Sequence, residues 1–276
     1  MTLSTAPIGV FDSGIGGLSV WREIVRQLPA ERTVYFADQA HLPYGPRSLT
    51  EVCGFARGVT RFLLDAGAKM IVVACNAASG AALHHLRETF PDVPFVGMEP
   101  AVKPAAEHTR TGVVGIIATS AAFQGELFQR LVERFATQVR LETQVCPGLV
   151  EAIEAGEAST PTTETLLRGY LAPLLAANID QLVLGCTHYP FASETIARIV
   201  GPGVTLIDPA PAVARQIARV LAQLDALAPA GNIANHQFYT SGDPAQLTVQ
   251  STQLVGYTGP ILRATWNGER LTENAG

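Results

Sequence analysis

The feature that most constrains the fold is an alternation of short apolar runs with longer segments of helical periodicity. The short runs are rich in Val and Ile and lie at residues 8–11, 34–36, 70–74, 113–117, 181–184 and 204–207. The longer segments repeat apolar residues every three or four positions, at residues 18–28, 49–66, 78–90, 123–135 and 210–227. Strands that alternate with helices in this way form parallel sheets covered on both faces. The sequence therefore predicts an α/β fold.

A weak internal repeat indicates that the chain consists of two related halves. The segment MIVVACNAAS (residues 70–79) resembles QLVLGCTHYP (residues 181–190), because each runs from an apolar strand through a small residue and a cysteine to Asn or Thr. In the same way, IGVFDSG (residues 8–14) resembles GIIATS (residues 115–120). Two pseudo-symmetric α/β halves would each place one cysteine, Cys75 or Cys186, at the carboxyl end of a strand.

Two proline-containing segments, MEP (residues 98–100) and DPAP (residues 208–211), mark the expected crossings between the halves. We predict a discontinuous first domain of residues 1–98 and 210–276, and a second domain of residues 99–209. The C-terminal segment then returns to the first domain, with an added strand at residues 236–239. Ligands bind beyond the carboxyl ends of strands in α/β sheets, so two such domains facing each other would place both cysteines in one cleft.

Charge and segment composition exclude several classes of partner. The formal net charge of −5 gives no electrostatic reason to expect nucleic acid binding. No segment approaches the ~20 apolar residues of a membrane span, and the first ten residues lack the pattern of a secretory signal. We therefore expect a cytoplasmic protein without a membrane partner, in which the four cysteines are thiols. Cys53 and Cys146 are expected to be structural.

Only two lysines, Lys69 and Lys103, are present, which bears on cofactor chemistry. Amino-acid chemistry with pyridoxal phosphate needs a lysine that forms a Schiff base. Lys69 comes just before an apolar strand and Lys103 lies between prolines, so neither looks like a buried cofactor lysine. No CxxC pair indicates zinc. We predict that the protein uses no cofactor and no metal.

Cys75 and Cys186 are the strongest candidates for chemistry. We expect each at a point where a strand gives way to a helix, and Asn76 is a good capping residue. A helix N-terminus lowers the pKa of a thiol, and His188 could polarise Cys186 or move a proton. A single free cysteine is more often a buried packing residue. The equivalent positions of the two in the repeat favour a functional role.

Two loops and one glutamate each allow a functional and a structural interpretation. The glycine-rich loop DSGIGG (residues 12–17) can hold an anion, whereas Asp12 could contact an ammonium group or simply cap a tight turn. The turn HLPYG (residues 41–45) offers backbone N–H groups to a carboxylate, or is an ordinary Pro/Gly turn anchored by Asp38. Glu154 lies at helical spacing after a Cys-Pro pair and could be a solvated carboxylate.

Taken together, these segments are similar to those of the glutamate racemases, within the aspartate/glutamate racemase family. The resemblance is carried by GVFDSGIGG (residues 9–17), FADQAHLPYG (residues 36–45), ACNAAS (residues 74–79), VEAIEAG (residues 150–156) and LGCTHYP (residues 184–190). Any one of these motifs is weak, but all five occur in order and cover nearly the whole chain.

The resemblance implies two flavodoxin-like domains with the active site in the cleft between them, and cofactor-independent interconversion of L- and D-glutamate. It implies that Cys75 and Cys186 are catalytic, with Asp12 as the partner of the first and Glu154 and His188 as partners of the second. The implied substrate-binding residues are Asp12, Ser13, Pro43, Tyr44, Gly45, Asn76, Ala77, Thr119 and Thr187. A homodimer that supplies D-glutamate for peptidoglycan, and thus for cell-wall biogenesis and cell shape, is also implied.

The chain departs from the family's pattern at two positions. Ala77 stands where the family's ACNTAS has a threonine, and Ala122 stands where a second threonine is frequent. Each change removes a hydroxyl donor, although the backbone N–H of residue 77 can still bind a carboxylate. Of two nearby glutamates, Glu154 keeps the family's spacing to the second cysteine better than Glu151.

Two thiols suit racemisation, because one can remove the α-proton from one face while the other delivers a proton to the opposite face. The ordinary pKa of a cysteine thiol, about 8.5, leaves both forms accessible near neutral pH. Two alternatives stay open: a racemase or decarboxylase of aspartate or another small diacid, and a non-catalytic protein that binds glutamate. The HYP segment (residues 188–190) favours glutamate over aspartate, Ala77 weakly favours the reverse, and the two cysteines disfavour a binding protein.

Overall fold

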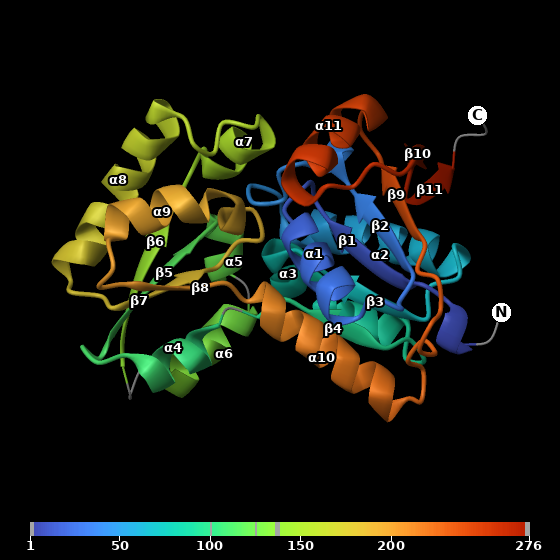
Figure 1. The fold of residues 1–276 in the computed structure, drawn as a ribbon, viewed down its shortest axis with the longest axis horizontal. Coiled ribbons are helices and arrows are strands. Elements are labelled where there is room, and N and C mark those ends of the chain that lie inside the picture. Colours follow the sequence, from blue (N-terminus) through green and yellow to red (C-terminus); the bar gives the residue numbers. More distant parts are fainter. Residues whose placement is uncertain (1–2, 100, 125, 136–138, 274–276) are drawn as a thin grey trace.

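The computed structural model describes residues 3–99, 101–124, 126–135 and 139–273. In it the chain forms two α/β halves that lie side by side, each built on its own sheet (Figure 1). The C-terminal strands return to the half that contains the N-terminus, as Figure 1 shows by the red and blue ribbons that lie together. The predicted α/β class is confirmed.

The secondary-structure elements have the following bounds. The first half contains β1 (Ile8–Asp12), β2 (Thr33–Ala37), β3 (Met70–Val73), β4 (Phe95–Gly97), β9 (His236–Thr240), β10 (Ile261–Asn267) and β11 (Arg270–Glu273). The second half contains β5 (Val113–Ala118), β6 (Arg140–Val145), β7 (Gln181–Leu184) and β8 (Thr205–Ile207). The α-helices are α1 (Leu18–Gln27), α2 (Leu49–Asp65), α3 (Asn76–Thr89), α4 (Val102–His108), α5 (Ser120–Gln124), α6 (Glu126–Phe135), α7 (Leu149–Glu154), α8 (Pro161–Ala176), α9 (Ser193–Val200), α10 (Ala210–Gln223) and α11 (Pro244–Val255). Short 3-10 helices are η1 (Leu3–Thr5), η2 (Gln39–His41) and η3 (Tyr189–Ala192). None of the helices in the described ranges is long and apolar enough to cross a membrane.

Four strands of the first sheet, in the order β2-β1-β3-β4, have the same arrangement as the four strands of the second sheet. Within the described residues, the first has the strand order β11-β10-β9-β2-β1-β3-β4 and the second β6-β5-β7-β8, and the strands pair in parallel except for β10 with β11. Thus β1 corresponds to β5 and β3 to β7. The N–H of Ala74 donates to the carbonyl of Phe11, and the N–H of Gly185 donates to that of Ile117, each at 2.8 Å. Cys75 and Cys186 therefore follow equivalent strands at equivalent positions.

The strands and helices with a clear apolar period lie where the sequence predicted them, within one or two residues at most ends. The prediction for residues 210–227 is wrong at its end, because α10 stops at Gln223 and Asp225 adopts a left-handed φ of 50°. The segment 123–135, predicted as one helix, contains the end of α5 and the whole of α6, and Gly125 between them lies outside the described residues. The predicted C-terminal strand is β9, whereas β4, β6, β10 and β11 were not predicted.

We propose that the domains divide at the two proline-containing segments, with residues 1–98 and 210–276 in one and 99–209 in the other. The sheets support this division, because the first takes its strands from residues 8–97 and 236–273 and the second from residues 113–207. Helix α4 packs against β5 and β7, whereas α10 packs against α1 and β4. Pro100, in the first crossing, lies outside the described residues.

Lys69 is buried, contrary to the interpretation of its sequence context. Its ammonium group lies 2.6 Å from a carboxylate oxygen of Glu31 and also donates to the carbonyl oxygens of Ser4 and Ala226. The side chains of Lys69 and Glu31 are 0% and 2% exposed. All three N–H donors of the ammonium are thus engaged, so Lys69 joins the N-terminal segment to the segment after α10 and is not free to form a Schiff base.

Candidate active site

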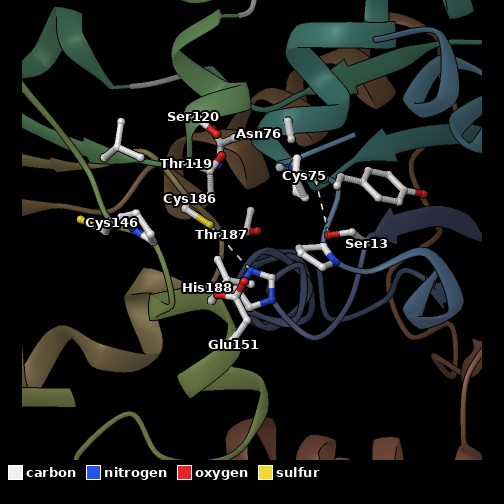
Figure 2. Close-up of a pocket in the computed structure, with 18 of the residues that line it drawn as sticks. Ser13, Cys75, Asn76, Thr119, Ser120, Cys146, Glu151, Cys186, Thr187 and His188 are labelled. Carbon is white, nitrogen blue, oxygen red and sulfur yellow. Dashed lines mark hydrogen bonds between the residues drawn. The ribbon is translucent and has the colours of Figure 1, made fainter. Parts of the chain in front are cut away.

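A cavity of about 220 Å³ lies between the two halves, at the carboxyl ends of β1, β3, β5 and β7 (Figure 2). Both halves contribute to its wall, and Cys75 and Cys186 lie on opposite sides of it (Figure 2). The described residues that border it are Ser13, Pro43, Tyr44, Gly45, Pro46, Cys75, Asn76, Ala77, Thr119, Ser120, Val145, Cys146, Pro147, Gly148, Val150, Glu151, Cys186, Thr187 and His188. Such a volume suits a small molecule.

Cys75 caps the N-terminus of α3. Its Sγ accepts a hydrogen bond from the N–H of Ala78 at 3.4 Å and lies 4.0 Å from Oγ of Ser13. Burial, reinforced by the negative charge of Asp12, raises the pKa of this thiol well above its ordinary value, and the bond from Ala78 only partly offsets this effect. The expectation that the helix N-terminus lowers the pKa of Cys75 is therefore wrong, because desolvation is the larger effect. Cys75 holds its proton at neutral pH.

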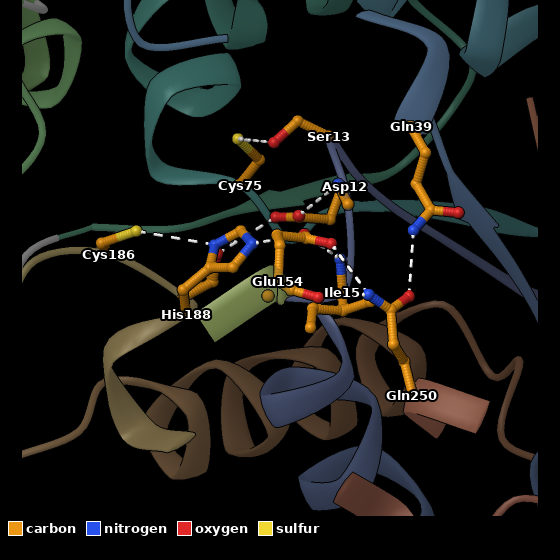
Figure 3. A network of polar contacts seen from close by, with 12 residues as sticks. Asp12, Ser13, Ile15, Gln39, Cys75, Glu154, Cys186, His188 and Gln250 are labelled. Atoms are coloured by element: carbon orange, nitrogen blue, oxygen red, sulfur yellow. Dashed lines mark hydrogen bonds and ion pairs between the residues drawn. The ribbon is translucent and has the colours of Figure 1, made fainter. Parts of the chain in front are cut away.

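Cys186 faces a chain of polar contacts in the second half. Its Sγ lies 3.7 Å from Nδ1 of His188, and Nε2 of His188 lies 2.8 Å from Oε1 of Glu154 (Figure 3). Burial by itself lowers the pKa of His188, but the contacts with Cys186 and Glu154 raise this pKa well above its ordinary value. His188 is therefore an imidazolium that pairs with Glu154 on one side and faces Cys186 on the other.

The local structure after Cys186 differs from that after Cys75. The sequence predicted a helix N-terminus at both cysteines, which is wrong for Cys186, because α9 begins only at Ser193. Pro190 has no N–H to donate to the carbonyl of Cys186, as an α-helix would require. The N–H of Tyr189 donates to that carbonyl instead, at 3.1 Å, and closes a tighter turn. Cys186 consequently depends on His188 rather than on a helix for its electrostatic environment.

Asp12 ends β1 and is fully buried, and it does not border the cavity. Its Oδ1 accepts the N–H of Gly14 at 2.8 Å, and its Oδ2 accepts the hydroxyl of Thr187 at 3.1 Å. Burial raises the pKa of Asp12, and the nearby charge of His188 offsets part of this effect. The structure thus places this carboxylate behind the wall of the cavity, where it links the two halves and acts on Cys75 through its charge.

The glycine-rich loop makes room for the second half. A Cβ on Gly14 would overlap Oε1 of Glu154, and a Cβ on Gly16 would overlap the ring of His188. The N–H of Ile15 donates to Oε1 of Glu154 at 2.8 Å. The N–H groups of the loop therefore bind carboxylates of the protein itself. The interpretation of this loop as an anion site for a ligand is wrong, because Asp12 and Glu154 occupy its donors.

The turn at residues 41–45 supplies Pro43, Tyr44 and Gly45 to the wall of the cavity. Asp38 anchors this turn, because its buried carboxylate accepts hydrogen bonds from the hydroxyl of Tyr44 and from the indole N–H of Trp266, both at 2.7 Å. Asp38 itself does not border the cavity. The carboxylate of Asp38, which accepts several hydrogen bonds, therefore holds the Tyr44 ring from the side away from the cavity.

Asn76 is the polar residue of the wall that most clearly awaits a partner. Both its Nδ2 and its Oδ1 are buried and lack a hydrogen-bond partner within the described protein. An unsatisfied buried polar group costs about 1–3 kcal/mol, so both atoms are available to a ligand. Ala77 and Thr119 also border the cavity, whereas the hydroxyl of Thr187 is engaged by Asp12.

The sequence did not predict Ser120 and Cys146 as residues of the site. Cys146, expected to be structural, borders the cavity, and burial raises the pKa of its thiol to about 12. Ser120 follows Thr119 at the end of β5 as Ser13 follows β1 in the first half. The repeat therefore contained the signal for Ser120, whereas nothing in the sequence around Cys146 indicated its position.

Glu151 also borders the cavity, whereas Glu154 lies behind His188 and does not border it. Among the described residues of the wall none is Lys or Arg. A carboxylate ligand would therefore be bound without an ion pair to Lys or Arg. No cluster of three or more His, Cys, Asp or Glu side chains suited to a metal ion occurs in the described ranges.

The fold and the cavity define a class of protein: an α/β protein in which two pseudo-symmetric halves each supply one cysteine to a cavity for a small molecule. Residues 8–217 match the family described as Asp/Glu/Hydantoin racemase. The chain belongs to this family.

Within it, the chain is similar to glutamate racemases along most of its length. It is 51% identical to the glutamate racemase of Herpetosiphon aurantiacus over 239 residues, which cover 87% of this chain and 94% of that one. The glutamate racemase of Francisella tularensis in complex with D-glutamate has a TM-score of 0.81 and 30% identity, covering 94% of this chain and 96% of that one. The Escherichia coli glutamate racemase in complex with L-glutamate and activator UDP-MurNAc-ala has a TM-score of 0.82 and 31% identity, covering 98% of this chain and 100% of that one.

Proposed function

We propose that this chain is a glutamate racemase, which interconverts L- and D-glutamate without a cofactor and uses Cys75 and Cys186 as its two bases. The observation that carries the proposal is that the two thiols border one cavity from opposite halves (Figure 2). Racemisation needs one group on each face of the α-carbon, because a single base would have to cross the ligand. The similarity to glutamate racemases in complex with D-glutamate and with L-glutamate supports this substrate.

In the direction of reaction described here, Cys186 acts as the base and Cys75 as the acid. Burial and the charge of Asp12 raise the pKa of Cys75, and the imidazolium of His188 faces Cys186. The Cys186 thiolate takes the α-proton of one enantiomer, and the electron pair of the broken C–H bond remains on the α-carbon. The Cys75 thiol then donates its proton to the opposite face. The two cysteines have exchanged protonation states, and the other enantiomer reacts in reverse.

The α-carbanion must be stabilised without Lys or Arg on the described wall of the cavity. The unpartnered amide of Asn76 and the backbone N–H groups at the start of α3, including that of Ala77, bind the α-carboxylate and the charge that spreads onto it. Preorganised donors of this kind stabilise a developing charge strongly in a site from which water is excluded. The other substrate-binding residues that we propose are Ser13, Pro43, Tyr44, Gly45, Thr119 and Thr187.

The roles of the buried acids follow from their contacts. Glu154 holds His188 in the orientation that presents Nδ1 to Cys186. Asp12 favours the thiol form of Cys75 through its charge and holds the hydroxyl of Thr187. We further propose that the enzyme is a cytoplasmic homodimer and that its D-glutamate supplies peptidoglycan synthesis, in keeping with its identity to glutamate racemases.

The test of this function is exchange of the α-proton in heavy water. We expect deuterium at the α-carbon of glutamate and formation of the opposite enantiomer, with little turnover of aspartate in a parallel reaction. Cys75→Ala and Cys186→Ala should each abolish racemisation. Parental rates in either variant would refute the two-base mechanism, tight binding of glutamate without exchange would make the protein a binding protein, and faster turnover of aspartate would change the substrate.

A further inference from the structure

Gln250 lies on α11, and its side chain points toward the candidate active site. Helix α11 follows β9 and packs against α1, β9 and β10 of the first half (Figure 1). The side chain of Gln250 is buried, with 8% of its surface exposed. Its Nε2 donates to the main-chain carbonyl of Glu154 at 2.7 Å and lies 3.4 Å from Oε2 of the same residue (Figure 3). Gln250 belongs to none of the motifs that indicated the function.

The orientation of the Gln250 amide follows from its contacts with Gln39 on one side and with Glu154 on the other. The hydroxyl of Thr240 donates to Oε1 of Gln39 at 2.8 Å, so the NH₂ group of Gln39 points the other way. That NH₂ group donates to Oε1 of Gln250 at 3.1 Å. The main-chain carbonyl of Glu154 can only accept a hydrogen bond, so the donor end of Gln250 must face Glu154, and Oε1 of Gln250 is left to accept from Gln39.

The Nε2 of Gln250 faces two acceptors of Glu154, its main-chain carbonyl and its carboxylate. Glu154 is the last residue of α7, where carbonyl groups lack partners within the helix, and Gln250 satisfies its carbonyl. In the carboxylate, Oε1 already receives the N–H of Ile15 and contacts Nε2 of His188, each at 2.8 Å, while Oε2 faces Gln250. Both the backbone and the side chain of Glu154 are thereby held in one position.

We propose that Gln250 is a positioning residue for the Cys186 side of the reaction, because it holds the Glu154 carboxylate that orients His188 toward Cys186. This inference rests on the proposed function. A group that bonds to the partner of a histidine fixes the orientation and basicity of the ring, and loss of comparable partners in metal sites costs about 10–100-fold. Gln250 also joins the two halves, since Glu154 lies in the second half and α11 in the first.

The first experiment compares Gln250→Met with Gln246→Met in the full chain. Methionine keeps the length of the side chain and removes its donor. Gln246 is an exposed residue of the same helix, so it provides the matched control. For racemisation of glutamate, we expect Gln250→Met to lower kcat by about 10–100-fold with KM nearly unchanged, and Gln246→Met to behave as the parent. Parental kcat in Gln250→Met would overturn the inference.

A second experiment separates positioning from a general loss of structure. If Gln250 acts through Glu154, the loss caused by Gln250→Met should nearly vanish in a Glu154→Gln background, because residues of one network are not additive. The same fold-loss in both backgrounds would show that Gln250 acts elsewhere.

A third measurement does not depend on activity. Nitrogen NMR of the His188 ring should show a lower pKa in Gln250→Met than in the parent, because a loosened Glu154 stabilises the imidazolium less. The alkaline limb of the kcat profile should move to lower pH with it. An unchanged titration of His188 would overturn the inference. If the parental protein failed to exchange the α-proton of glutamate, the proposed function would fall, while the titration would still decide whether Gln250 positions His188.

Discussion

An alanine at Gly16 tests whether His188 must lie where the structure places it. A Cβ on Gly16 would overlap Nδ1 of His188 and lie 2.6 Å from its Cε1. Atoms in ordinary contact lie about 3.5–4.0 Å apart, so the ring has to move by about 1 Å. The ring cannot make this movement and keep both its 3.7 Å contact with Cys186 and its 2.8 Å contact with Glu154.

The expected loss has two parts. A displacement of about 1 Å costs a catalytic group about 100-fold in rate, so we expect kcat of Gly16→Ala to fall by about that factor. Extra volume in a well-packed interior costs about 1–3 kcal/mol of stability, which corresponds to about 2–4 °C in Tm for each kcal/mol in a protein of this size. The parent and the variant should therefore both be folded at 25 °C, and the loss of rate belongs to the folded enzyme.

The assay measures racemisation at a saturating concentration of glutamate and uses circular dichroism to monitor the reaction. Thermal unfolding is measured on the same samples. The matched control is Gly54→Ala in α2, where a Cβ meets nothing within 4 Å. That variant should keep its kcat and gain about 0.5–1 kcal/mol, because alanine is favoured over glycine within helices. A folded Gly16→Ala protein with parental kcat would refute the role given to the position of His188.

Three further predictions follow from buried polar groups. Asn76→Leu should raise the KM for glutamate at least tenfold while the fold is kept, and steady-state kinetics with an unchanged KM would exclude Asn76 from binding. Lys69→Met should lower stability by about 3–5 kcal/mol in denaturant unfolding, since it leaves the charge of Glu31 buried and unpaired; adding Glu31→Gln should recover most of this loss. Because the pKa of Cys75 is raised in the folded protein, the unfolded chain releases this proton first, and stability falls above about pH 8.5 by up to about 1.4 kcal/mol per pH unit. Cys75→Ser should make the fall of Tm with pH shallower, and equal slopes would contradict the raised pKa.

The fold was predictable where an element carries its own period. Strands such as β3 and β7 are continuous apolar runs because helices cover both faces of their sheets. The edge strand β6 has the sequence RLETQV and mostly accessible side chains, so no apolar run marks it. Strand β4 has only three residues, and the antiparallel pair β10–β11 lies at the exposed edge of the first sheet. These elements are defined by the strands that they pair with and carry no apolar period of their own.

The site was predictable to the extent that the repeat and the motifs carry it. They indicated Cys75 and Cys186, and these two cysteines border the same cavity. They could not indicate why the loop DSGIGG is rich in glycine, because its partner Glu154 lies 139 positions from Ile15. For the same reason the pKa of Cys75 was predicted in the wrong direction, since the burial and the charge of Asp12 that raise it come from the folded protein around the thiol and not from the local helix.

The duplicated fold places the two cysteines equivalently, yet their surroundings are not equivalent. Burial and the carboxylate of Asp12 raise the pKa of the Cys75 thiol, whereas Cys186 faces the imidazolium of His188. In the two-base mechanism that we propose, a turnover leaves the two cysteines with exchanged protonation states, so the free enzyme must move a proton between them before it repeats the same direction. The contacts of Asp12 with Thr187 and of Glu154 with Ile15 hold both environments in one rigid arrangement between the halves. The two cysteines therefore have unequal surroundings, although the symmetry of the fold alone would make them equal.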